Sequence, residues 1–195
     1  MGRELRRRRR ASGDRGTALV ESAIILPFLA LMVFGIVELG FMFRSASVVT
    51  SSTRTGARLM SAQYGSAKAV DQPTIISAVR QTVEKDLSNR SPVDTPKRLW
   101  IYKARADGLP LSGDFTSCTS PCFTFTWTGS SFTMNAGGSW PSPVVCGVDH
   151  DSVGVFVEMD HAPVGFASFL GTMTLGEHTV MTLEAPNPNT CPGGT

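Results

Sequence analysis

Residues Ala18–Phe43 read ALVESAIILPFLALMVFGIVELGFMF, and this stretch decides the fold. Its 26 residues include two charged ones, Glu21 and Glu38. As a helix the stretch would extend about 39 Å, which exceeds the roughly 30 Å hydrocarbon core of a bilayer. Apolar side chains would lie on every side of that helix, more than one small domain could cover. The stretch therefore predicts a membrane span over residues 18–43 rather than a core helix of a soluble protein.

Charge is unevenly distributed along the 195-residue chain. Residues 1–16 hold seven Arg and two acidic residues, a net charge of +5, so the remainder carries −3. A short basic tail ahead of an apolar helix is typical of a membrane-targeting segment, and we expect no nucleic-acid partner. The positive-inside rule keeps the Arg-rich end in the cytoplasm. We therefore expect a single-pass protein of the cell membrane, with its C-terminal part on the extracytoplasmic side.

Three kinds of N-terminal signal combine basic and apolar residues. A secretory signal peptide could be cut near Ser47, but its apolar stretch has only about 7–15 residues. A twin-arginine signal requires a particular sequence around its Arg pair, which the run Arg6–Arg10 lacks. A prepilin-type leader is cut on the cytoplasmic side and leaves the apolar helix on the mature protein. The position of Gly16 directly before the helix, with Glu21 five residues later, favours this third kind.

Residues 15–21, RGTALVE, together with the following SAIILPFLALMVFGIVELG, resemble the TadE-like pseudopilins (minor pilins) of the tight-adherence, or Flp-type, pilus system. The resemblance covers about residues 15–58, where TGAR at 55–58 is also typical, and a weaker similarity lies in residues 153–184. One departure is Ser22, where the family more often has Phe.

The resemblance implies how the chain is processed and what it contacts. A membrane-embedded prepilin peptidase of the aspartic class would cut between Gly16 and Thr17, and Glu21 would become the fifth residue of the mature chain. Other pilin or pseudopilin subunits, the pilus assembly machinery and the lipid bilayer would be its further partners.

The chemistry of this spacing is consistent with that role. Gly16 has no side chain, so a protease can approach the backbone closely. Cleavage would create an α-amino group on Thr17, which could pair with Glu21 of a neighbouring subunit and offset part of the cost of a carboxylate in the membrane. The alternative is that Glu21 only complements the dipole at the helix N-terminus.

The residues after the span predict a small α+β domain. We expect a leader at 1–16, a long helix at 17–63, an extracytoplasmic domain at 64–185 and a Pro-rich tail at 186–195. Apolar spacing predicts a second helix over Thr74–Leu87, and residues 163–175 are expected to form a packed loop. Alternating residues predict an antiparallel sheet of four or five strands, at about 100–105, 123–128, 132–134, 153–159 and 178–183.

The four cysteines, Cys118, Cys122, Cys146 and Cys191, all lie in the expected extracytoplasmic part. An even number in that compartment favours disulfides, with three possible connectivities. A local Cys118–Cys122 loop would leave Cys146 to tether Cys191. The rival is a zinc site that combines these thiols with a histidine, although the spacing matches no familiar zinc module.

Catalytic motifs have little support in this sequence. His150 and His161 lie beside aspartates, but such residues are usually solvated or act as caps, and no nucleophile motif or phosphate-binding glycine loop is present. We expect no enzyme activity, no cofactor and no metal. The sequence predicts a structural pseudopilin, with two alternatives: a secreted soluble domain, or a plain single-pass anchor that carries a binding or enzymatic domain.

Overall fold

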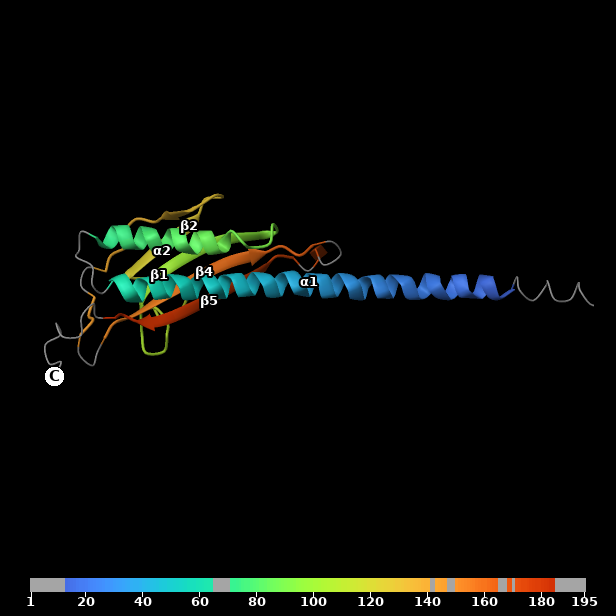
Figure 1. The fold of residues 1–195 in the computed structure, drawn as a ribbon, viewed down its shortest axis with the longest axis horizontal. Helices are drawn as coiled ribbons and strands as arrows, with labels where there is room; N and C mark the ends of the chain where they lie inside the picture. Colours follow the sequence, from blue (N-terminus) through green and yellow to red (C-terminus); the bar gives the residue numbers. More distant parts are fainter. Residues whose placement is uncertain are drawn as a thin grey trace, which may run out of the picture.

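The structure is a computed structural model, and it describes residues 13–64, 71–140, 143–146, 150–164, 168–169 and 171–184. The first helix, α1, runs from Gly13 to Gln63 without interruption. It is about 76 Å long, and its N-terminal half projects far beyond the rest of the molecule (Figure 1). The helix thus begins four residues earlier than expected and extends into the predicted leader. The tail at 186–195 and most of the leader lie outside the described residues.

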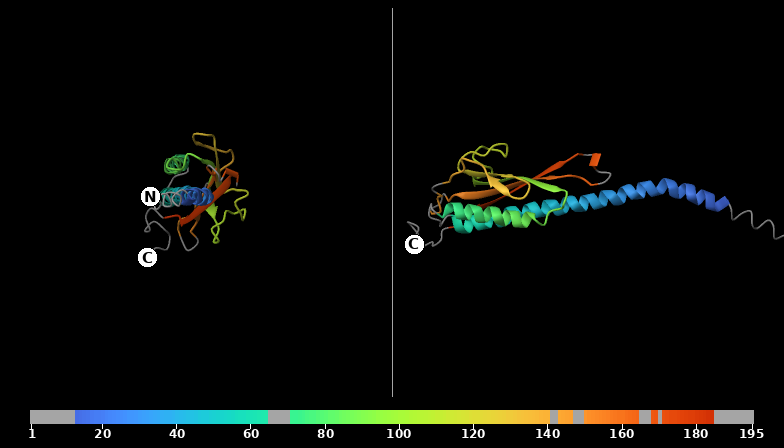
Figure 2. Two further views of the ribbon diagram at one scale, coloured as in Figure 1. Left: turned by 90° about the vertical axis from the view of Figure 1, so that its right-hand side faces the viewer. Right: turned by 90° about the horizontal axis from the view of Figure 1, so that it is seen from above.

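The projecting half of α1 is bent. Figure 2 shows the bend in its N-terminal part, which by sequence contains Pro27. Proline removes one helical hydrogen bond and crowds the preceding turn, so it is the natural cause of a kink. The helix nevertheless continues on both sides of the bend.

A second helix and a five-stranded sheet pack on the C-terminal half of α1. The elements are α2 (Gln72–Leu87), β1 (Asp94–Ala104), β2 (Cys122–Trp127), β3 (Phe132–Met134), β4 (Ser152–His161) and β5 (Met173–Thr182). The sheet order is β3-β2-β1-β4-β5, and every neighbouring pair is antiparallel. These elements, with α1 from Ser45 onward, form what we call the head domain. The predicted α+β fold is confirmed.

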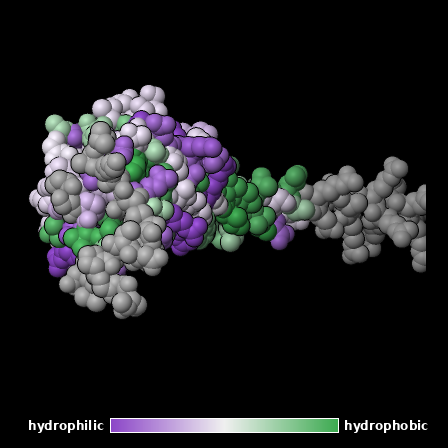
Figure 3. Space-filling model, turned by 60° about the vertical axis from the view of Figure 1, so that its left-hand side comes forward, coloured by the Kyte–Doolittle hydropathy of each residue, from purple (hydrophilic) through white to green (hydrophobic). Residues whose placement is uncertain are grey.

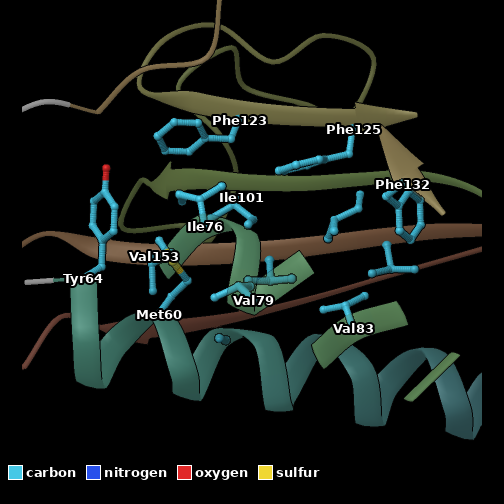
Figure 4. Packing of buried hydrophobic residues seen from close by; sticks show 14 of the residues in the cluster. Met60, Tyr64, Ile76, Val79, Val83, Ile101, Phe123, Phe125, Phe132 and Val153 are labelled. Carbon is cyan, nitrogen blue, oxygen red and sulfur yellow. The ribbon is translucent and has the colours of Figure 1, made fainter. Parts of the chain in front are cut away.

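The main core lies between the two helices and one face of the sheet. Figure 4 shows side chains of α1 and α2 pointing toward those of the strands, and each fully buried large side chain contributes about 1.5–3 kcal/mol. Gly56 of α1 lies where the helices and sheet meet, because a Cβ there would be 3.0 Å from Val83 and 3.3 Å from Val155. The buried members of this core include Val49, Met60, Tyr64, Ile76, Val79, Val83, Leu87, Leu99, Ile101, Phe123, Phe125, Phe132, Val153, Val155, Val157 and Met159.

A smaller cluster covers the opposite face of the sheet. Trp100, Tyr102 and Phe156 are buried there beneath Phe115, whose ring stacks on Phe156 with centroids 4.3 Å apart. Phe115 belongs to the long connection between β1 and β2. Because this connection covers the second face, β1 is buried on both sides, which its sequence alternation alone did not indicate.

Two strands begin well before the residue that the sequence predicted. β1 begins at Asp94 instead of residue 100, because Pro96 and a register shift between Pro96 and Arg98 interrupt the apolar alternation. β5 begins at Met173 instead of residue 178, since this half-exposed edge strand pairs with β4 along its whole length. Residues 173–175 of the expected loop are therefore strand.

Candidate functional site

The projecting part of α1 exposes apolar side chains on all sides. The segment is long and apolar enough to cross a membrane, and its most apolar window is entirely unburied. Figure 3 shows apolar residues gathered on the projecting helix, whereas the face of the head domain in view is mostly polar. Apolar surface of this extent marks contact with lipid or with another chain. Its exposed large side chains are Leu19, Val20, Ile24, Ile25, Leu26, Phe28, Leu29, Leu31, Met32, Val33, Phe34, Ile36, Val37, Leu39 and Phe43.

The predicted processing residues lie near the N-terminal end of α1. Gly16, Thr17, Val20, Glu21 and Ile24 line one open face of α1. Apart from the helix itself, no heavy atom of the described residues lies within 4 Å of the position that a Cβ on Gly16 would occupy, and Glu21 is exposed. Thr17 and Glu21 are four residues apart, which places them one turn apart on the same side of the helix.

A buried cluster of charged groups joins the projecting helix to the head domain. His161, at the end of β4, is completely buried, and its Nδ1 lies 2.6 Å from Oδ1 of Asp94 at the start of β1. Its Nε2 lies 2.9 Å from Oε1 of Glu38 in α1. Glu38 Oε2 also accepts a hydrogen bond from the backbone N–H of Val164, at 3.0 Å. We call Glu38, Asp94 and His161 the junction triad.

Asp94 is held in place by two further donors. The hydroxyl of Ser45 donates to Asp94 Oδ2 at 2.5 Å, and the backbone N–H of Ser91 donates to the same oxygen at 3.0 Å. Ser45 belongs to α1, so two side chains of this helix, Glu38 and Ser45, bind the ends of β4 and β1 from positions about two turns apart.

The junction triad favours a positively charged histidine. Burial by itself lowers the pKa of His161, but the hydrogen bonds and negative charges of Asp94 and Glu38 outweigh it, and the pKa is raised above the ordinary 6.5. Only the doubly protonated ring can donate to carboxylates from both nitrogens. Both hydrogen bonds and the direction of the pKa shift therefore fit a protonated ring between two carboxylates.

The expectation that His161 is solvated or acts as a cap was wrong. Val153, Val155, Val157 and Met159 face the core in alternation, and the same period of two places His161 on that side. That alternation was the available signal, although it did not identify Glu38 as the partner. His150 is exposed, as expected of a loop histidine.

Two of the four cysteines form the predicted local disulfide. Cys118 and Cys122 are bonded with their Cα atoms 6.0 Å apart, in the cluster beneath the β1–β2 connection. Their pairing removes both thiols from any zinc site. Cys146 is also disulfide-bonded, and Cys191 lies outside the described residues, so its predicted pairing stays a prediction.

Comparison with known proteins identifies one part of the chain. Residues 16–58 match the family model described as TadE-like protein. The match includes the projecting helix and the first turns that pack into the head domain. No curated protein and no solved structure matches the chain significantly.

Proposed function

Because residues 16–58 match the family model of TadE-like proteins, we propose that this chain is a structural, membrane-anchored pseudopilin, or minor pilin. It takes part in assembling a tight-adherence type pilus or secretion apparatus, in contact with other subunits of that system. The chain spans the cell membrane once through α1, with its N-terminus in the cytoplasm and the head domain outside. The observation that carries this proposal is the fully exposed apolar helix on a packed head domain.

The surroundings of Gly16 support processing by a prepilin peptidase. Among the described residues, no part of another element lies within 4 Å of the position that a Cβ on Gly16 would occupy, so the backbone there is open to approach. A protease must draw the chain into an extended conformation, and glycine makes a helix easier to unwind by about 1 kcal/mol relative to alanine. Cleavage between Gly16 and Thr17 removes the basic leader and leaves the apolar helix on the mature protein.

The position of Glu21 supports a role in assembly. An unpaired carboxylate costs roughly 2.5–3.5 kcal/mol at the bilayer centre and less near its edge. Within the described part of the chain, Glu21 lies on a helix that no other element covers. The new α-amino group on Thr17 of a neighbouring subunit supplies a matching positive charge. Pairing across subunits therefore favours the assembled state.

The contacts of the junction argue against release of a soluble domain by cleavage near Ser47. Such a cut would remove Glu38 and Ser45, and it would leave Asp94 and His161 buried without two of their partners. Breaking a buried charge cluster in this way is costly. A plain single-pass anchor would keep the same contacts. Cleavage after Gly16 and incorporation into a pilus are the properties that distinguish the pseudopilin from such an anchor.

The variant Glu21→Ala tests the assembly role. We expect the protein to insert into the membrane normally, because removing a charge from the span eases insertion. Its fraction in sheared pili, measured against the membrane fraction, should fall several-fold, with about tenfold for each 1.4 kcal/mol of pairing that is lost.

Two controls make the result specific. Ser22→Ala changes the adjacent residue without removing a charge and should assemble normally. Glu21→Asp keeps the charge and should be incorporated into pili in part. If Glu21→Ala assembles as efficiently as the unchanged protein, the pairing role of Glu21 is wrong.

A further inference from the structure

The β4–β5 hairpin reaches further along the projecting helix than the other elements of the head domain. Two orthogonal views show β4 and β5 extending toward the N-terminal part of α1, beyond the end of α2 (Figures 1 and 2). Contacts fix this placement, because His161 and Val164 at the end of β4 both bind the Glu38 carboxylate. The tip therefore lies at the level of Glu38 on the helix.

The described part of the hairpin tip exposes apolar side chains. Val164 is 46% exposed and Phe169 is 69% exposed, so the packed loop expected over residues 163–175 does not bury these two side chains. On α1, Leu39 and Phe43 are exposed close to the same level. Exposed apolar side chains therefore occur at this level on both the hairpin and the helix.

The position of the membrane boundary follows from the helix, on the premise of the proposed membrane span. The uncharged window Ser22–Val37 has its centre between residues 29 and 30. A hydrocarbon core of about 30 Å centred there extends about ten residues in each direction, to about Leu39. Glu38 and the hairpin tip beside it therefore lie at the outer edge of the hydrocarbon core.

We propose that Val164 and Phe169, which lie between β4 and β5, form a membrane-contact surface that inserts into the outer leaflet beside α1. Apolar and aromatic side chains at this depth leave water and enter the region between the lipid headgroups and the acyl chains, which is favourable. A carboxylate without a partner would be unfavourable this close to the hydrocarbon core. The Glu38 carboxylate has a partner, because it is hydrogen-bonded to His161. The hairpin would give the head domain a second contact with the bilayer and fix its tilt.

The bilayer is the occupant that the geometry favours over a neighbouring subunit. The tip adjoins the helix at the depth where lipid must surround α1, so a bilayer reaches both surfaces without any further partner. Arg44 is exposed one residue after Phe43, and it donates to the carbonyl of Asn89 at 3.0 Å. Its charge lies where lipid phosphates would lie.

Depth-dependent quenching in vesicles tests this proposal on the full chain. The variant Phe169→Cys is labelled with bimane and reconstituted into vesicles of phosphatidylethanolamine and phosphatidylglycerol that contain a lipid with a nitroxide near the headgroup. Two labelled variants serve as references. Leu39→Cys reports the helix at the expected boundary, and Met134→Cys reports an exposed apolar residue on β3, within the head domain.

We expect the label at position 169 to be quenched by the lipid nitroxide at least about twofold more than the label at 134, and to be shielded from aqueous iodide like the label at 39. This result should not depend on the ratio of protein to lipid. If position 169 behaves like 134 while 39 is quenched, the span is real and the hairpin inference is wrong.

Two other outcomes also contradict the inference. If position 169 is shielded from both quenchers only at high protein density, a second copy covers the tip instead of lipid. If position 39 also escapes the lipid nitroxide, α1 does not span the membrane as proposed, and the inference fails together with its premise.

Discussion

Replacing His161 by alanine tests whether the junction triad holds α1 to the head domain. The substitution removes a completely buried ring that lies 2.6 Å from Asp94 and 2.9 Å from Glu38. Removing one partner of a buried charge pair costs about 3–5 kcal/mol. Asp94 would keep its bonds from Ser45 and Ser91, so we expect a loss near 3 kcal/mol, the lower end of that range.

The pH dependence of this effect follows from the raised pKa of His161. A group whose pKa rises on folding binds its proton more tightly in the folded state. Its contribution is therefore fully present below the ordinary value of 6.5 and is lost as the pH rises through the folded value. The stability difference between the unchanged protein and His161→Ala should be largest near pH 6 and smaller in alkaline solution.

Urea and thermal unfolding of the full chain in nanodiscs, followed by circular dichroism, measure this difference. A loss of about 3 kcal/mol corresponds to a fall of about 10 °C in Tm for a domain of this size. The matched control is His150→Ala, which removes an exposed histidine and should be nearly neutral. Unchanged stability of His161→Ala, or a difference that is the same at every pH, would refute the reasoning.

Two further predictions concern the second face of the sheet and the tyrosines. Gly154→Ala should destabilise the protein by at least about 2 kcal/mol in urea unfolding, because its Cβ would lie 2.2 Å from the ring of Tyr102, whose hydroxyl is fixed on Gly108 O; a variant as stable as the unchanged protein would mean that the ring can move aside. Burial raises the pKa of Tyr64 to about 12 and also raises the pKa of Tyr102, so alkaline titration should show no phenolate absorbance until well above the ordinary value of 10. Both contributions to stability are present below pH 10 and are lost as the pH rises through the folded values, and a native spectrum that titrates near 10 would contradict the burial of these side chains.

Local patterns in the sequence predicted much of the fold. The spacing of apolar residues in the sequence predicted the long apolar helix and the second helix, which ends at Leu87. The alternation of apolar and polar residues predicted β2, with Phe123 and Phe125 in the core. The Cys118–Cys122 disulfide was predicted because its two residues are close in sequence. In each case the signal lies within a few turns or one strand.

The junction triad could not be predicted in the same way. Glu38, Asp94 and His161 are far apart in sequence, and they meet only because β1 and β4 pair and their ends reach α1. A glutamate at the end of a membrane span has an ordinary interpretation as a boundary residue. Only the tertiary structure identifies it as the partner of a buried histidine.

The extended strands and the exposed hairpin tip depend on long-range context as well. Charged residues near the start of β1 have partners on β4, as Arg98 has in Glu158. β1 therefore includes polar residues that the sequence pattern left outside the strand. The apolar residues at 164 and 169 indicated a packed loop by composition, whereas the fold leaves them exposed beside α1. Composition alone cannot distinguish burial in protein from burial in lipid.

The N-terminus of the native protein, determined by mass spectrometry in cells with and without the prepilin peptidase, tests the proposed function most directly. We predict a mature chain that begins at Thr17 only when the peptidase is present, with α1 retained as its membrane anchor. A chain that begins at Val48 would instead show a secreted domain. A chain that keeps its leader in both strains would show a plain anchor, and either result would contradict the proposed processing at Gly16.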